Sequence, residues 1–181
     1  MFSPINTFND VKLLNQNTLV ICDIDETLFY WKKRPQDFHQ IIIEDFPDYT
    51  QKQVEEEAID WLNMYRRMTQ PSMTDSDGFN NLRKKIESLP NSKIIFLTAR
   101  NNCQSDDNKY TRKHFESNKL NYDDFAIHYT DNKISKGEYI KNNIKLDGYR
   151  DIIFIDDYVS YIKTVNDALP NIICYKFEPT Y

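Results

Sequence analysis

Five short apolar runs are spaced along this 181-residue chain, and they constrain its fold more than any other feature. Each run is rich in β-branched or aromatic residues and is nearly continuous rather than alternating. This pattern is typical of strands in a parallel sheet that is covered on both faces, because neither face of such a strand meets water. The runs cover residues 18–22, 93–97, 125–129, 151–155 and 171–177.

Helical patterns separate most of these runs. In residues 79–89, three apolar side chains share one helix face, and Pro90 follows. Ser135 and Glu138 have the spacing of a capping box, which predicts that a helix begins there. Further helices are expected over residues 109–118 and 159–169. Strands that alternate with helices predict a three-layer α/β, Rossmann-like domain with a parallel sheet of about five strands.

A long insert interrupts this alternation after the first run. About 50 residues, at about 29–78, stand where a much shorter connection is usual, and residues 53–68 within them have a helical pattern. The chain has no internal repeat and no low-complexity linker. We therefore expect one domain over residues 1–181, with a small and mainly helical insert at about 29–78.

Two acidic residues directly follow the first run. Asp23 and Asp25 are two positions apart at the end of a predicted strand, so both side chains can point toward one crevice. One carboxylate there can hold Mg²⁺ and attack phosphorus, and a second can donate and accept a proton. The alternative is an acidic turn in which the aspartates cap the next element.

A threonine and a lysine stand at comparable places. Thr98 ends the second run, where its hydroxyl can bind a phosphate oxygen or cap the next turn. Lys136 lies in the first turn of the helix expected from Ser135, where a cation opposes the helix dipole unless it faces an anion. It could also be an ordinary surface lysine, and Lys133 is a nearby competitor for the same role.

A second acidic pair, Asp156 and Asp157, ends the fourth run. Adjacent carboxylates at the end of a buried strand repel each other unless a cation lies between them. The alternative is a solvated loop. The four motifs in this order are improbable by chance, and together they favour one site that handles phosphate.

These motifs resemble those of the haloacid dehalogenase-like (HAD) superfamily of phosphatases and phosphotransferases. The matching segments are VICDIDETLF, IIFLTAR, ISKGEYI and IIFIDD, spread over residues 19–157. The resemblance implies that the five runs take the order 5-4-1-2-3 in the sheet. It also implies a phosphatase that works through an aspartyl-phosphate. The insert matches no segment of the family pattern, but its place after the first strand is where members of this superfamily carry a cap that selects the substrate.

The resemblance also implies roles for individual acidic residues. Asp23 would be the nucleophile and Asp25 the general acid and base. Asp156 would bind the Mg²⁺ cofactor together with Asp23 and the backbone carbonyl of Asp25. Asp157 would support the metal or the lysine.

Two further residues would bind the transferring phosphoryl group. By the same resemblance these are Thr98 and Lys136. The substrate would be a phosphomonoester, which we expect to be a small molecule, although the fold does not fix its identity.

Three other functions use similar residues. A signalling receiver domain places its acidic pair first and its phosphoacceptor on a middle strand, whereas here the acidic pair comes last. A catalytically silent phosphate-binding protein has no reason to keep a costly cluster of carboxylates. A phosphotransferase or mutase shares every motif described above and stays open.

Composition limits the partners and the cellular compartment that we expect for this protein. The net charge of −5 argues against a dedicated nucleic-acid-binding surface. No apolar run reaches the roughly 20 residues of a membrane span, and the first residues lack a secretory signal. The cysteines, Cys22, Cys103 and Cys174, have no metal-ligand spacing and indicate a reducing compartment. We expect a cytoplasmic protein whose oligomeric state the sequence leaves open.

Overall fold

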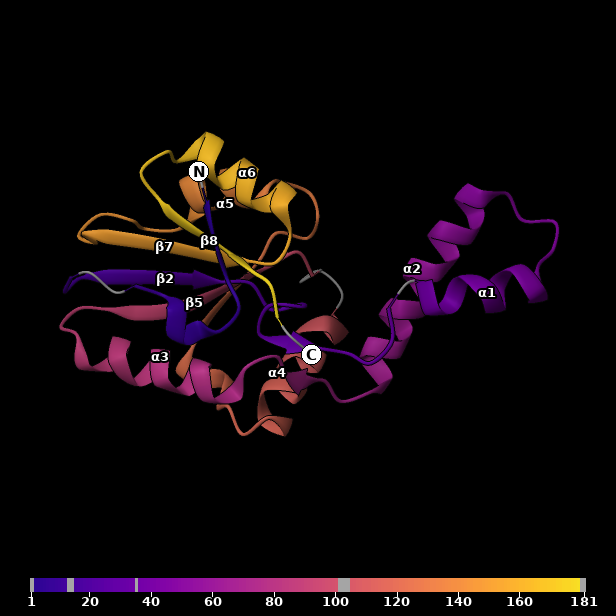
Figure 1. Ribbon diagram of the computed structural model, residues 1–181, viewed down its shortest axis with the longest axis horizontal. Helices are drawn as coiled ribbons and strands as arrows, with labels where there is room; N and C mark the ends of the chain where they lie inside the picture. Colours follow the sequence, from indigo (N-terminus) through magenta and orange to yellow (C-terminus); the bar gives the residue numbers. More distant parts are fainter. Residues whose placement is uncertain (1, 13–14, 35, 101–104, 180–181) are drawn as a thin grey trace.

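A parallel sheet of six strands forms the centre of the computed structural model, which describes residues 2–12, 15–34, 36–100 and 105–179 (Figure 1). The strand order is β1-β8-β7-β2-β5-β6, and every neighbouring pair is parallel. The strands are β1 (Phe2–Ile5), β2 (Thr18–Cys22), β5 (Lys93–Thr98), β6 (Ala126–Tyr129), β7 (Asp151–Asp156) and β8 (Ile173–Phe177). All five predicted runs are therefore strands, and they take the expected order 5-4-1-2-3.

Strand β1 was not predicted. It is four residues long, and it pairs with β8 at the edge of the sheet, with Phe2 opposite Cys174 and Ile5 opposite Phe177. Pro4 lacks a backbone N–H, which an edge strand tolerates and a central strand does not. A short segment that contains proline gives little strand signal on its own.

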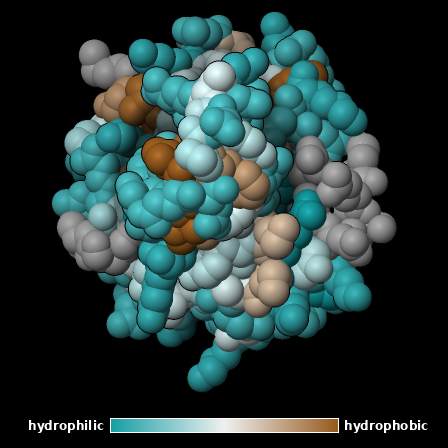
Figure 2. Space-filling model, turned by 90° about the vertical axis from the view of Figure 1, so that its right-hand side faces the viewer, coloured by the Kyte–Doolittle hydropathy of each residue, from teal (hydrophilic) through white to brown (hydrophobic). Residues whose placement is uncertain are grey.

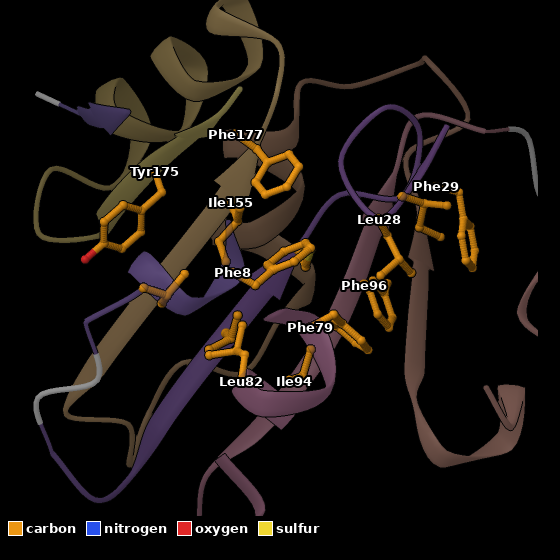
Figure 3. Close-up of a cluster of buried hydrophobic side chains, with 14 of the residues drawn as sticks. Phe8, Leu28, Phe29, Phe79, Leu82, Ile94, Phe96, Ile155, Tyr175 and Phe177 are labelled. Atoms are coloured by element: carbon orange, nitrogen blue, oxygen red, sulfur yellow. The ribbon is translucent and has the colours of Figure 1, made fainter. Parts of the chain in front are cut away.

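Helices cover both faces of the sheet, as the three-layer prediction requires. The apolar residues of β2 alternate between the two layers: Val20 and Cys22 belong to one hydrophobic cluster, and Leu19 and Ile21 belong to the other. The first cluster, shown in Figure 3, includes residues of α3 (Ser76–Ser88) and α4 (Ser105–Ser117). The second includes residues of α5 (Lys136–Asn143) and α6 (Val159–Ala168). Both faces of β2 are thus buried, which explains its continuous apolar sequence.

The ends of the helices differ slightly from the prediction. Helix α3 begins three residues before the expected start, because Asp75 caps it by accepting a hydrogen bond from the N–H of Gly78 at 2.9 Å. Helix α4 begins four residues early, and α6 ends one residue early. Helix α5 begins as predicted, and the Ser135 hydroxyl accepts a hydrogen bond from the N–H of Glu138 at 3.1 Å.

The insert is a helical hairpin on a two-stranded base. Strands β3 (Phe29–Tyr30) and β4 (Ser72–Met73) pair antiparallel, and α1 (Gln36–Asp45) and α2 (Gln51–Met68) lie between them. Figure 1 shows the two helices projecting from one end of the molecule. Helix α2 was predicted to begin two residues later than it does, and α1 was not predicted.

The hairpin has a small core of its own. Ile42, Val54 and Ala58 are buried in it, and Phe38 and Trp61 pack against them. Several apolar side chains stay exposed, and Figure 2 shows brown, hydrophobic atoms on the projecting side of the molecule. Those of the hairpin are Ile41, Ile43, Phe46, Tyr49, Ile59, Met64 and Met68.

Two further expectations concern membranes and thiols. Within the described residues, no helix combines the length and the apolar character that crossing a bilayer requires. Cys22 and Cys174 are free and buried, as their apolar surroundings predicted. Cys103 lies outside the described residues.

Candidate active site

The site is formed where several parallel strands end. Asp23 directly follows β2, Asp156 ends β7, and Thr98 ends β5. Since β7, β2 and β5 are neighbours and run in the same direction, these ends meet at one edge of the sheet. Lys136, the first residue of α5, reaches the same edge, so the structure brings together residues that are up to 133 positions apart.

The centre of the site is a buried lysine between two aspartates. The Lys136 ammonium donates hydrogen bonds to Oδ1 of Asp23 and, at 2.7 Å, to Oδ2 of Asp156. All three side chains are almost completely buried. Burial alone would lower the pKa of Lys136, but Asp156 and Asp23 outweigh it and raise the pKa above its usual value. Lys136 is therefore a permanent cation that faces the two carboxylates.

Asp157 completes a group of three carboxylates with Asp23 and Asp156, whose oxygens lie within 4.8 Å of one another. The Thr27 hydroxyl fixes Asp157 in place by donating to its Oδ1 at 3.2 Å and accepting from its backbone N–H at 3.0 Å. Burial and the neighbouring charge of Asp156 together raise the pKa of Asp157 to about 7. The three carboxylates therefore carry more negative charge than Lys136 alone can balance.

Asp23 is also destabilised as a carboxylate by its negative neighbours. Burial raises its pKa well above the usual range, and Asp156 and Asp157 add to the rise, whereas Lys136 opposes it. Three carboxylates against one ammonium leave a formal charge of −2 at this point. A divalent cation bound by oxygen ligands would neutralise that charge.

Asp25 lies in a different electrostatic environment. Its carboxylate accepts hydrogen bonds from Nε and Nη2 of Arg100 at 2.9 and 3.0 Å, and Arg66 lies 3.8 Å away. Burial alone would raise the pKa of Asp25, but Arg100 and Arg66 outweigh it and hold the pKa well below the usual range. The two aspartates of the first motif therefore differ: Asp23 faces carboxylates and a lysine, and Asp25 faces arginines.

Thr98 lies beside Asp25 and is completely buried. Its hydroxyl donates to Oδ2 of Asp25 at 3.4 Å and accepts from the N–H of Arg100 at 3.3 Å. The hydroxyl thus links the second motif to the first. It also caps the turn that follows β5, so the two functions considered for Thr98 are compatible.

Lys133 lies apart from this cluster. Its side chain is 68% exposed and its ammonium is 3.7 Å from the carboxylate of Asp131. Of the two lysines that the sequence offered, only Lys136 reaches the carboxylates of Asp23 and Asp156 in the described structure.

No sequence motif assigned a role to Arg66, Arg100, His114 or Thr27. Arg100 is in the second motif, next to Ala99, and a basic residue just after a strand end is a signal for an anionic neighbour. Arg66 belongs to α2 of the insert, and its approach to Asp25 depends on how the hairpin is placed. Nδ1 of His114 lies 3.4 Å from Nη1 of Arg100.

Gly137 provides a test of how tightly the site is built. A Cβ at this position would lie 2.0 Å from the backbone oxygen of Thr164, so α5 and α6 can approach this closely only with glycine. We expect Gly137→Ala to push the helices apart, to destabilise the fold by about 1–3 kcal/mol and to displace Lys136. Chemical denaturation measures the loss, with Asn142→Ala on the exposed side of α5 as control. An unchanged unfolding midpoint for Gly137→Ala would contradict this packing.

Comparisons with known proteins add little to this geometry. No protein-family model matches the chain, and no curated protein matches it. Among solved structures, a chain of the Pnkp1/Rnl/Hen1 complex is similar, with a TM-score of 0.47 and 17% sequence identity. The similarity covers 90% of this chain and 47% of that one, so this chain spans about half the length of its structural neighbour.

Proposed function

We propose that this protein is a Mg²⁺-dependent phosphohydrolase of the HAD type that cleaves a phosphomonoester through an aspartyl-phosphate at Asp23. The observation that carries the proposal is the buried cluster in which Lys136 contacts both Asp23 and Asp156 while Asp157 lies alongside. Carboxylates are rarely buried together unless their charge is used. A nucleophile, a phosphate-binding cation and a metal site would explain every member of the cluster.

The residues present fit a magnesium ion. Mg²⁺ prefers oxygen ligands and is usually bound through one or two carboxylates, with water or substrate phosphate in the other positions. Asp23 and Asp156 would hold it, with the backbone carbonyl of Asp25 completing the set of protein ligands and Asp157 supporting it. When bound, the ion would stabilise the negative charge that develops on the phosphoryl oxygens.

The chain's own residues would carry the reaction in two steps. In the first, a carboxylate oxygen of Asp23 attacks phosphorus, a new P–O bond forms, and the P–O bond to the leaving group breaks as Asp25 supplies a proton to that oxygen. In the second, Asp25 takes a proton from water, the water oxygen attacks phosphorus, and inorganic phosphate leaves. Asp23 is then restored, and the sum is hydrolysis of the ester.

The surroundings of Asp25 favour one of its two roles in the resting protein. Arg100 and Arg66 stabilise its carboxylate form, which is the form that takes a proton from water. Donation to the leaving group requires the protonated form, which these arginines oppose. We therefore expect the substrate to draw at least one guanidinium away from Asp25 before the first step.

Lys136 and Thr98 would act on the phosphoryl group itself. The Lys136 ammonium is already turned toward the nucleophile, so it can bind a phosphoryl oxygen next to the attacked phosphorus. The Thr98 hydroxyl lies between Asp25 and the Arg100 N–H, and it can donate a hydrogen bond to a second phosphoryl oxygen.

Phosphate release from a panel of phosphorylated metabolites, with Mg²⁺ present, tests the proposal. The Asp23→Asn protein serves as the blank, because it has the same fold and impurities but no nucleophile. We expect the wild-type protein to release phosphate from some members of the panel and from p-nitrophenyl phosphate. Equal release by both proteins would mean that the activity belongs to a contaminant or to another residue.

A further inference from the structure

Glu26 has an unusual backbone conformation for a residue with a long side chain. Its φ is 61°, in the left-handed region that glycine adopts most readily. Among the described residues, six others than glycine have a positive φ, and four of these are Asn or Asp, which enter this region at less cost. Glu26 and Lys119 are the other two. A strained residue next to a functional group is a sign that its side chain is used.

The turn around Glu26 lies within the first motif. Glu26 directly follows Asp25, and its backbone N–H donates a hydrogen bond to the carbonyl of Phe29 at 2.7 Å. Thr27, the next residue, holds Asp157 through its hydroxyl. A change of backbone conformation at Glu26 is therefore opposed on both sides.

Two arginines of the insert meet the Glu26 carboxylate. Its Oε1 accepts a hydrogen bond from Nη2 of Arg66 at 3.0 Å, and its Oε2 lies 3.4 Å from Nη2 of Arg34. Arg34 precedes α1 and Arg66 lies in the last turn of α2, so the two pairs come from the two ends of the hairpin. The side chains of Glu26 and Arg66 are 17% and 23% exposed, so their ion pair is screened less by salt and water than a surface pair.

Arg66 is held in place on three sides. Besides its bond to Glu26, its Nη1 lies 3.8 Å from Oδ1 of Asp25, and its guanidinium carbon lies 4.9 Å from the centre of the buried Trp31 ring. A planar guanidinium can meet carboxylates at its edge and an aromatic ring at its face. A mobile arginine would lose conformational entropy on reaching Asp25, and Glu26 and Trp31 remove that cost in advance.

Asp25 is thereby oriented from two parts of the fold. Arg100, just after β5, donates to both of its carboxylate oxygens at 2.9 and 3.0 Å, and Arg66 approaches Oδ1 from α2. A carboxylate that takes a proton from water must point at that water. Contacts from two directions restrict the rotation of the carboxylate more than contacts from one direction do.

We propose that Glu26 is a positioning residue for the reaction: it holds Arg66 of the insert against Asp25, so that the insert helps to orient the group that moves the proton. The inference rests on the proposed function, which supplies the role of Asp25. Glu26 and Arg66 both act through Asp25. Their effect falls on the second step, in which Asp25 takes a proton from water.

Glu26→Gly separates the side chain from the backbone conformation. Glycine adopts a φ of 61° without strain, which offsets the loss of the ion pairs, so we expect a melting temperature within about 4 °C of the wild-type value. Arg66 then loses its anchor, and Asp25 loses its second contact. Lys119→Gly is the matched control, because Lys119 also has a φ of 61° and is an exposed residue after α4.

Steady-state hydrolysis of p-nitrophenyl phosphate in Mg²⁺ tests the proposal. The p-nitrophenolate ion leaves with little help from an acid, so the attack of water limits turnover and kcat reports the second step. We expect Glu26→Gly and Arg66→Ala each to lower kcat by about 10-fold, the scale of one hydrogen bond to a charged group. KM should fall in proportion, because the first step, which sets kcat/KM, is unchanged.

The double variant Glu26→Gly/Arg66→Ala should be no slower than the slower single variant, since Glu26 acts through Arg66. Lys119→Gly should keep the wild-type kcat and KM. Wild-type kcat in Glu26→Gly would overturn the proposal, and so would losses that multiply in the double variant. A fall in kcat/KM with kcat preserved would make Arg66 a substrate-binding residue and would also refute it.

Arg66→Ala keeps the test decisive if Glu26→Gly melts far below the wild type, because wild-type kcat in Arg66→Ala would then leave Glu26 with a structural role only. Asp23→Asn is assayed beside these variants. Equal hydrolysis by the wild type and Asp23→Asn would refute the proposed function and this inference with it. Hydrolysis that needs Asp23 but neither Glu26 nor Arg66 would refute this inference alone.

Discussion

Asp23→Asn should abolish hydrolysis while leaving the protein folded. The amide cannot form the bond to phosphorus and is a poor ligand for Mg²⁺, so we expect turnover to fall by at least about 1,000-fold, as for other essential groups that act as a unit. The measurement is steady-state phosphate release from the best substrate of the panel, with circular dichroism and thermal melting on the same samples.

The thermal stability of the Asp23→Asn protein should not fall with its activity. Burial together with Asp156 and Asp157 raises the pKa of Asp23, so its ionised form is unfavourable in the folded state at neutral pH. The neutral amide relieves that repulsion, and in metal-free buffer we expect a melting temperature equal to that of the wild type or higher. Wild-type turnover in the variant would rule out Asp23 as the nucleophile, and loss of the fold would leave the buried cluster with a structural role instead.

Lys136→Ala should impair both catalysis and stability. Its removal leaves Asp23 and Asp156 buried without their cation, and breaking a buried ion pair on one side costs about 3–5 kcal/mol. The transferring phosphoryl group also loses its positive partner, so turnover in saturating Mg²⁺ should fall by about 100-fold or more. Rates and urea denaturation midpoints are measured on the same preparations.

Lys133→Ala is the matched control, because Lys133 lies three residues away and is largely exposed. We expect its turnover to stay within a few-fold of the wild-type value and its stability to change little. Lys136→Met keeps most of the side-chain volume and separates charge from packing. If Lys133→Ala were severe and Lys136→Ala mild, the phosphate-binding lysine would have been assigned to the wrong residue.

The arrangement of strands and the acidic cluster could be predicted because both depend on local sequence. A continuous apolar strand must be buried on both faces, and a carboxylate that directly follows it must lie at the edge of the sheet. Asp23, Thr98 and Asp156 each end such a strand or follow one directly, and Lys136 follows a serine cap, so their meeting depends on little besides the strand order.

Other features depend on tertiary contacts that no local pattern reveals. Strand β1 is stabilised by its pairing with β8, which lies at the other end of the sequence. Helix α1 has one fully buried residue, Ile42, and its packing against α2 sets its position. Neither element has a strong signal by itself.

The arginines near Asp25 illustrate the same limit within the site. Arg66 lies in the last turn of α2, where basic residues are common because they interact favourably with the helix dipole. Its contacts with Asp25 and Glu26 follow from the placement of the hairpin beside the sheet, which the sequence pattern does not encode. Arg100 follows Thr98 in the same motif, but its direction was settled only by the structure.

The proposed metal dependence is based on the charge of the cluster. Asp23, Asp156 and Asp157 outnumber Lys136, and in the proposed mechanism a divalent cation would make the cluster attractive to a phosphoryl group. Calcium prefers more ligands at longer distances than magnesium does, so it should restore little activity.

Phosphate release after metal removal therefore tests the central claim most directly. The protein is treated with EDTA, exchanged into metal-free buffer and assayed with its best substrate during a titration with Mg²⁺ and, separately, with Ca²⁺. The account predicts no hydrolysis without metal, saturable recovery with Mg²⁺ and little recovery with Ca²⁺. Full hydrolysis in metal-free buffer would contradict it.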